Sequence, residues 1–210
     1  MKLCKLLFLF CVSVISLGAS PEIGKAAPGF QLPAQDGKNY SLEGFKGSYV
    51  VLEWFNDGCP YVKKFYDKKF SKMQQLQKKW TLEKKGDAPV IWLSVLSSAP
   101  GKQGYMTAEE AAEKKSKLGA HMSAILLDPD GKVGKLYAAK TTPHMFVIDP
   151  EGVLRYMGAI DDQPSARTSS LAGAKNYVEQ ALESLMKGEP VTTAETKPYG
   201  CSVKYQSGWF

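Results

Sequence analysis

The hydrophobic pattern between residues 49 and 80 is the feature around which the rest of the chain is arranged. Residues 49–55 are β-branched and aromatic, which predicts a buried strand. Residues 56–58 (Asn-Asp-Gly) are polar breakers that end it. Pro60 suits the first position of a helix, where a missing N–H has no cost. The pattern therefore predicts a strand, a tight turn and a helix from Pro60 to about Trp80.

The hydrophobic segments further along the chain alternate between strand and helix. Residues 90–96 form a continuous apolar run, typical of a strand covered on both faces. Thr107 and Glu110 form a capping box that predicts a helix to about Leu118. The other expected elements are a hairpin at 30–32 and 39–42, a strand at 124–127, a short helix at 133–138, a hairpin at 145–148 and 153–157, and a last helix from 177 to about 188. This order predicts an α/β fold with a central mixed sheet and helices on both faces.

Cys59 lies between the turn and the predicted helix. Unpaired N–H groups and the helix dipole stabilise an anion at a helix start, and Lys63 and Lys64 add positive charge one turn on. The lysines of this helix are otherwise expected to form a solvated face. A cysteine in this position is a candidate low-pKa nucleophile. A buried structural cysteine is the alternative, since free cysteine is often buried; the order of strand, breaker, Cys-Pro and helix favours the reactive interpretation.

The N-terminal segment has the pattern of an export signal. Lys2 and Lys5 precede a largely apolar run from Leu6 to Leu17, and small residues follow up to Ser20. The run is short for a transmembrane helix, which needs about 20 residues. We expect cleavage near Ala19 and an exported protein, periplasmic or otherwise extracytoplasmic, with no stable membrane span. Retention as an uncleaved membrane anchor is the alternative.

The length and charge of the chain limit what else it can be. Its 210 residues suffice for one domain with a sizeable core. The formal charge of +6 falls to +4 without Lys2 and Lys5, and it is scattered over many lysines. A positive charge this small and scattered does not indicate nucleic-acid binding. We expect a signal peptide at 1–19, one domain at 20–188 and a C-terminal tail at 189–210.

Two of the four cysteines remain once the signal is removed, namely Cys59 and Cys201. A mixed disulfide on Cys59 needs a second sulfur to resolve it, and Cys201 is the only other thiol of the mature chain. Tyr199 and Tyr205 give the tail apolar anchors, and Gly200 lets its backbone approach a partner closely. We predict a Cys59–Cys201 disulfide on oxidation, with the tail closing over the turn and freed again by reduction. A purely structural staple is the alternative.

Three segments together resemble the thioredoxin superfamily. Residues 54–62 resemble its active-site turn, with Cys59 as the first cysteine of Cys-x-x-Cys and Val62 in place of the second. Residues 141–149 resemble the cis-proline loop and the strand after it. Residues 24–32 resemble the opening of redoxin, or AhpC/TSA (alkyl hydroperoxide reductase/thiol-specific antioxidant), domains. The resemblance implies a thioredoxin fold.

The match is closest to peroxiredoxin-like exported redoxins with a single active-site cysteine and a Tyr-Gly-Cys-Ser-Val-Lys-Tyr tail, here residues 199–205. It implies that residues 20–188 are a thioredoxin-like (redoxin) domain. True peroxiredoxins carry Pro-x-x-x-Thr/Ser-x-x-Cys, whereas Leu52 and Asn56 stand at the matching positions here. The resemblance therefore supports thiol chemistry more than peroxidase activity.

The resemblance also implies roles for residues around Cys59. Pro143 would be cis and face the cysteine, and Thr142 would offer its backbone to an extended substrate. Glu53, in the strand leading to the site, matches a buried acid used for proton transfer; a solvent-facing strand residue is the alternative. His144 lies next to Pro143 and could polarise the thiol or bind a metal, although a packing role is more common for a lone histidine.

The leading hypothesis is an exported thiol-disulfide oxidoreductase or antioxidant protein with Cys59 as nucleophile and Cys201 as resolving cysteine. Its partners would be protein or small-molecule thiols, disulfides or peroxides, together with an external electron donor. No cofactor or metal is expected. The alternatives are a thiol peroxidase, a copper-binding thioredoxin-fold chaperone that uses thiolate and imidazole ligands for Cu(I), and a non-catalytic binding domain.

Overall fold

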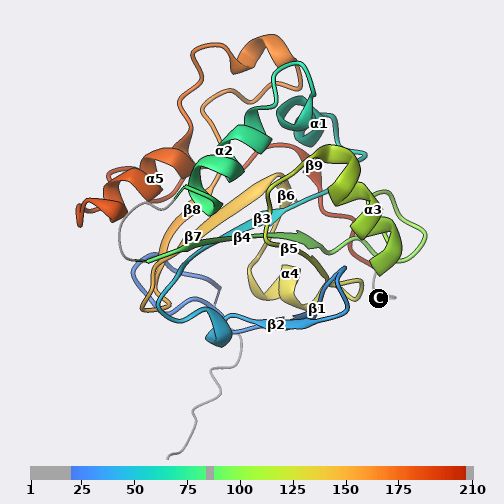
Figure 1. The fold of residues 1–210 in the computed structure, drawn as a ribbon, viewed down its shortest axis with the longest axis horizontal. Coiled ribbons are helices and arrows are strands. Elements are labelled where there is room, and N and C mark those ends of the chain that lie inside the picture. Colours follow the sequence, from blue (N-terminus) through green and yellow to red (C-terminus); the bar gives the residue numbers. More distant parts are fainter. Residues whose placement is uncertain (1–19, 84–87, 207–210) are drawn as a thin grey trace, which may run out of the picture.

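The computed structural model describes residues 20–83 and 88–206. A five-stranded sheet crosses the centre of the molecule (Figure 1). Its order is β5 (Ala124–Leu127), β4 (Val90–Leu96), β3 (Tyr49–Trp54), β7 (His144–Ile148) and β8 (Leu154–Gly158). The first three strands are parallel, and β7 and β8 are antiparallel to their neighbours. The sheet is mixed, as the sequence predicts.

Strand β3 is central because both of its faces are covered. Val51 and Phe55, the residue directly after the strand, pack into one hydrophobic layer. Leu52 and Trp54 pack into the other. All four side chains are at most 2% exposed. The strand therefore delivers the chain rigidly to the turn before Cys59.

Helices lie on both faces of the sheet, but unequally (Figure 1). The first face carries α1 (Pro60–Tyr66), α2 (Lys72–Thr81), α3 (Ala108–Leu118) and α5 (Tyr177–Met186). The second face carries the short helix α4 (Lys132–Leu136), the hairpin of β1 (Gln31–Pro33) and β2 (Asn39–Ser41), and the 3₁₀ turn η1 (Glu43–Phe45). Together with the mixed sheet, this arrangement confirms the predicted α/β class.

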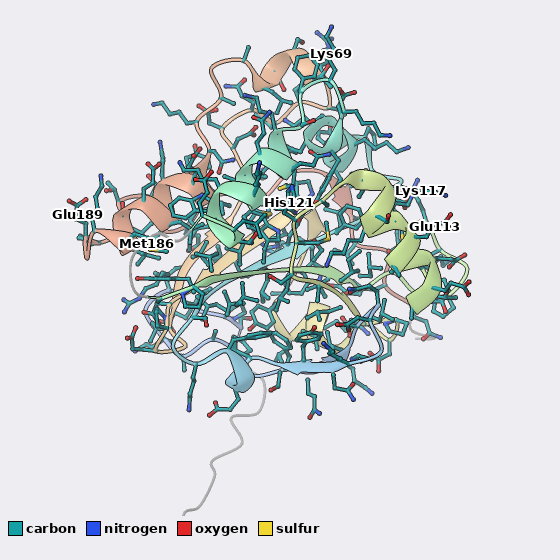
Figure 2. All side chains as sticks on the ribbon, in the orientation of Figure 1. Lys69, Glu113, Lys117, His121, Met186 and Glu189 are labelled. Carbon is teal, nitrogen blue, oxygen red and sulfur yellow. The ribbon has the colours of Figure 1, made fainter. Side chains whose placement is uncertain are left out.

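Helix α3 begins as predicted, with both hydrogen bonds of the Thr107–Glu110 capping box present. Its outer face is charged. Glu113 and Lys117 point away from the sheet (Figure 2) and pair at 2.6 Å. An exposed pair of this kind contributes little to stability, so the packing of the buried Ala111 against the sheet layer holds the helix in place.

The expectation of one helix from Pro60 to Trp80 is wrong, because α1 ends at Tyr66 and α2 begins at Lys72. Asp67 causes the break. Its carboxylate accepts a hydrogen bond from the Lys69 N–H at 2.9 Å, which competes with helical bonding. Ser71 then takes a left-handed conformation with φ 45°. The helix that begins after Cys59 therefore has only two turns.

The C-terminal tail docks on the domain along much of its length. Its short strand β9 (Cys201–Ser202) pairs antiparallel with β6 (Thr141–Thr142). Upstream, the Thr196 N–H donates to the Met157 carbonyl of β8 at 3.1 Å. The tail thus passes from the edge of the sheet to the active-site turn.

Two expectations concern the chain outside the central fold. The predicted signal peptide at 1–19 lies outside the described residues. Among the residues that the structure does describe, no helix is long and apolar enough to cross a bilayer.

Candidate active site

Cys59 occupies the N-cap of α1, with extended backbone angles and Pro60 at the first helical position. Its side chain is 0% exposed. The buried Asn56 shapes the turn before it, since its side-chain oxygen accepts the Gly58 N–H at 2.8 Å. The thiol is therefore held at a fixed position beneath other parts of the chain.

The loop that follows β4 packs against this turn. The Asn56 side-chain amide donates to the Gln103 carbonyl at 3.2 Å. Gly104 has φ +87°, and a Cβ there would lie 2.5 Å from the Asn56 side chain. Asn56 is a supporting residue that sequence reasoning passed over as a strand breaker, although its place in Asn-Asp-Gly is typical of a side chain that bonds the backbone two residues on.

The Thr142–Pro143 peptide bond is cis, as the resemblance implied. This geometry places the Thr142 carbonyl oxygen 3.1 Å from the Cys59 Sγ, where it accepts a hydrogen bond from the protonated thiol. Thr142 is itself 2% exposed. The cis-proline loop and the cysteine thus meet although 83 positions separate Cys59 from Thr142.

The tail brings Cys201 to the same place. In the β6–β9 ladder Cys201 is the partner of Thr142, and its thiol hydrogen-bonds to Cys59. Gly200 makes this approach possible, because a Cβ there would lie 2.1 Å from the Thr142 carbonyl oxygen. Both cysteines are free thiols in the structure. Docking of the tail therefore does not need a disulfide, and the expectation that reduction alone frees the tail is wrong.

The two thiols have opposite pKa shifts. Burial alone would raise the pKa of the Cys59 thiol, but hydrogen bonds from the Cys201 side chain and backbone and from Thr142 outweigh it, and the pKa is lowered. Burial and the hydrogen bond to Cys59 raise the pKa of Cys201 to about 11. Cys59 is thus the more acidic thiol of the pair.

The positive charges of Lys63 and Lys64 contribute less to the lowered pKa of Cys59 than the sequence predicts. Lys63 is exposed, and Lys64 turns inward, where its ammonium donates to the Tyr199 hydroxyl at 3.0 Å and to the Gln163 carbonyl at 2.9 Å. The Lys64 side chain is fully buried and lies 3.7 Å from the Asp161 carboxylate. Neither lysine is among the groups that lower the pKa of Cys59. Lys64 is an anchor for the tail, not part of a solvated face.

The tail is anchored on both sides of Cys201. Before it, the Tyr199 hydroxyl also donates to the Asp161 carboxylate, and the ring packs edge-on against Tyr61 at 5.9 Å. After it, the Val203 N–H donates to the Lys140 carbonyl at 3.1 Å.

Tyr205 completes the docking. Its hydroxyl donates to the Ala139 carbonyl at 2.8 Å. A Cβ on Gly131 would lie 2.6 Å from the Tyr205 ring, and a Cβ on Gly134 would lie 2.5 Å from the Tyr205 hydroxyl oxygen. These contacts fix the backbone around Cys201 independently of any covalent bond.

A sequence profile of the AhpC/TSA family matches residues 23–157, more than half of the chain. The chain belongs to the AhpC/TSA family. The match includes Cys59 and Pro143, whereas Cys201 lies beyond it. No curated protein matches the chain.

Several solved structures resemble this chain in fold. An uncharacterized conserved protein from Geobacillus kaustophilus has a TM-score of 0.74 and 25% identity over 90% of this chain and 94% of its own. A hypothetical protein from Sinorhizobium meliloti 1021 has a TM-score of 0.68 and 23% identity over 90% and 98%. A candidate protein disulfide isomerase from Bacteroides thetaiotaomicron has a TM-score of 0.55 and 17% identity over 80% and 91%. These likenesses support the thioredoxin fold.

Glu53 of this AhpC/TSA chain is buried, not solvent-facing. Its carboxylate accepts hydrogen bonds from the Tyr66 hydroxyl at 2.9 Å, the Trp92 indole at 2.9 Å and the Ser94 hydroxyl at 3.1 Å. Burial raises its pKa to about 7, against these hydrogen bonds. Glu53 faces the same layer as Cys59 and can hold a proton near neutral pH, but its hydrogen bonds go to this network and not to the thiol.

His144 does not reach Cys59. It stacks on Phe146, with ring centroids 4.5 Å apart, in the layer on the other face of the sheet. Its Nδ1 accepts the Lys140 N–H at 3.3 Å, and burial lowers its pKa to about 3. Among the described residues no group of three or more His, Cys, Asp or Glu side chains could hold a metal ion. The arrangement therefore favours thiol chemistry over a Cys–His copper site.

Proposed function

We propose that this AhpC/TSA protein is an exported thiol-disulfide oxidoreductase in which Cys59 is the nucleophile and Cys201 the resolving cysteine. One observation carries the proposal: a buried helix-start thiol of lowered pKa hydrogen-bonds to the thiol of a second cysteine beside a cis-proline loop. The domain would span residues 20–188 and the tail residues 189–210. Its partners would be thiols and disulfides, with an external thiol as electron donor.

The reaction proceeds by two exchanges. The Cys59 thiolate attacks one sulfur of an outside disulfide R–S–S–R′, forming a Cys59–S–S–R mixed disulfide and releasing R′S⁻. Cys201 then gives up its proton and attacks the Cys59 sulfur, which forms the Cys59–Cys201 disulfide and releases RS⁻. The outside disulfide gains the two electrons that the cysteine pair loses, and an external thiol donor later returns them.

The tail has to yield before the first exchange. Cys59 is fully buried, and β9 occupies the edge of β6 that an extended substrate would use at Thr142. We therefore infer that a substrate disulfide displaces β9 transiently. The β6–β9 ladder contains only two residue pairs. Separating β9 from β6 therefore costs little free energy compared with unfolding the domain.

Exchange with glutathione disulfide tests this proposal in matched variants. We expect Cys59→Ser to lose exchange. Cys201→Ser should instead accumulate a stable mixed disulfide on Cys59 and stop there, because no resolving thiol is left. Full activity in Cys59→Ser would contradict the proposal.

Export rests on the N-terminal pattern of a charged start, an apolar run and small residues. N-terminal sequencing of the protein made in a secreting host tests it. We expect a mature chain that begins near Ser20. A chain that retains Met1 and stays in the cytoplasm would contradict export without bearing on the thiol chemistry.

A further inference from the structure

We propose that this protein binds a small zwitterion of the α-amino-acid class in a cavity between its C-terminal tail and the residues that flank the cis-proline loop. The cavity lies on the other face of the sheet from Cys59, because His144, which lines it, stacks on Phe146 of the second hydrophobic layer. The inference goes beyond the proposed function and does not depend on it, since no redox step takes place in this cavity.

The cavity has a volume of about 190 Å³ and is formed by the domain and the tail together. The domain contributes Lys140, His144 and Met157, and the tail contributes Glu195 and Pro198. Pockets for drug-sized ligands usually measure about 300–1,000 Å³, whereas one water molecule occupies about 30 Å³ of the liquid. The space therefore suits a ligand of roughly six water-sized groups, which is the size of a small amino acid.

His144 presents an unused hydrogen-bond donor to this cavity, although its side chain is only 6% exposed. Burial lowers the pKa of the imidazole to about 3, so the ring is neutral near pH 7. Its Nδ1 accepts the Lys140 N–H at 3.3 Å, and the single ring proton is therefore on Nε2. Among the described residues Nε2 has no partner, and it is not one of the fully enclosed polar atoms that lack one. The Nε2–H group is thus open to an acceptor oxygen in the cavity.

Lys140 and Glu195 give the cavity one charge of each sign. The Lys140 ammonium lies close enough to His144 to contribute, after burial, to the lowered pKa of the imidazole. Glu195 comes from the tail, where it forms an isolated bridge with Met157 of β8. In the part of the chain that the structure describes, neither charge forms an ion pair, whether with the other or with a third residue. Two opposite charges that line one cavity without meeting leave room for a ligand that carries both.

The rest of the lining limits the ligand to a small one with few other polar groups. Two hydroxyls are already used, since Tyr137 donates to a backbone carbonyl at 2.6 Å and Thr196 accepts a backbone N–H at 2.9 Å. Met157 and Pro198 supply apolar surface. A ligand carboxylate would accept from the imidazole and face the lysine ammonium, and a ligand ammonium would face the tail carboxylate. The apolar surface would cover a short side chain, as in alanine.

NMR of the imidazole rings tests the inference, because His121 and His144 are the only two histidines of the chain. Purified protein with isotope-labelled histidine and no affinity tag is titrated with L-alanine. We expect a saturable shift of the His144 Nε2–H signal and none at His121, which does not line the cavity. No response at His144, or an unsaturable drift of both rings, would overturn the inference and leave the proposed function untouched.

Acetate and ethylamine separate the two halves of the ligand. Each carries one of the two charges of alanine, so each should bind at least about tenfold more weakly through the loss of one charge-assisted contact. Glu195→Gln should weaken alanine by a similar factor without weakening acetate. Glu189→Gln is the matched control, because Glu189 is an exposed acid of the same tail that does not line the cavity. Acetate that binds as tightly as alanine, or equal alanine affinity in the two variants, would contradict a zwitterion site.

Ligand binding should also hold the tail against β8. The Thr196 N–H donates to the Met157 carbonyl at 3.1 Å, and the Met157 N–H donates to the Ala194 carbonyl at 3.0 Å. A ligand that contacts both walls binds the docked tail better than the released tail, and it therefore favours docking. We expect saturating L-alanine to slow hydrogen exchange at these two amides in the wild type, and to slow it less in Glu195→Gln. Equal exchange rates with and without alanine would contradict the tail's part in the site.

Discussion

The carbonyl oxygen of Thr142 lies 3.1 Å from the sulfur of Cys59. The same carbonyl also restricts which residue the tail can carry at position 200, because only glycine fits beside it there. One peptide group, fixed by the cis bond to Pro143, therefore positions both the buried thiol and the strand that covers it. The chemistry proposed above depends on this shared contact.

The pKa of Cys59 should depend on Cys201. In Cys201→Ala the hydrogen bond from the Cys201 thiol is lost while burial remains, so we expect the pKa of Cys59 to rise. Ultraviolet absorbance of the thiolate across pH measures this. Cys201→Ser keeps a hydroxyl donor and should raise the pKa less than alanine does. An unchanged pKa in both variants would show that Cys201 does not stabilise the thiolate.

Glu53 should make the folding stability depend on pH. Its pKa is raised from 4.5 to about 7, so the folded state holds the proton more tightly than the unfolded state. The stabilisation is complete below about pH 4.5 and is lost as pH rises through 7, a difference of about 3 kcal/mol.

Urea unfolding of the wild type and of Glu53→Gln at pH 5 and pH 8 checks this prediction. The amide cannot ionise, and it can still accept from Trp92 and Ser94 while donating to the Tyr66 hydroxyl. We expect the loss of stability between the two pH values to be smaller in the variant by about 2.5 kcal/mol. An equal loss in both proteins would rule out a buried ionisation at Glu53.

Tyr199 should hold the tail through its hydroxyl. Tyr199→Phe removes the hydroxyl that donates to the Asp161 carboxylate and accepts from the Lys64 ammonium. The carboxylate and the ammonium then stay buried, each with one hydrogen-bond partner fewer. We expect a loss of about 1–3 kcal/mol in unfolding free energy and faster amide hydrogen exchange at Val203. Tyr61→Phe is the control, because it keeps the ring that packs against Tyr199. Equal exchange rates in the two variants would contradict an anchoring role.

Much of the fold could be predicted from the sequence, because its strands are continuous apolar runs. Residues 49–54 and 90–96 form β3 and β4 as expected. The split of the first helix could not be predicted from hydrophobic spacing, because it depends on one hydrogen bond of Asp67 to the backbone. Local polar competition of this kind leaves little trace in a hydrophobic pattern.

The site was predicted in part. Cys59 and Pro143 stand out through the turn and the resemblance, and the structure brings them together with Cys201. His144 faces the opposite layer, since side chains alternate along a strand and its neighbour in the sheet is Trp54. The burial of Lys64 was unforeseen because its partners, Asp161 and Tyr199, come from distant segments.

The central claim is that Cys59 and Cys201 form one redox pair. The most direct measurement is tryptic mapping of the protein, without reduction, after mild oxidation by a small-molecule disulfide. We predict a single peptide pair joined through Cys59 and Cys201 within one chain. Both thiols free after oxidation, or linked only between chains, would contradict the account.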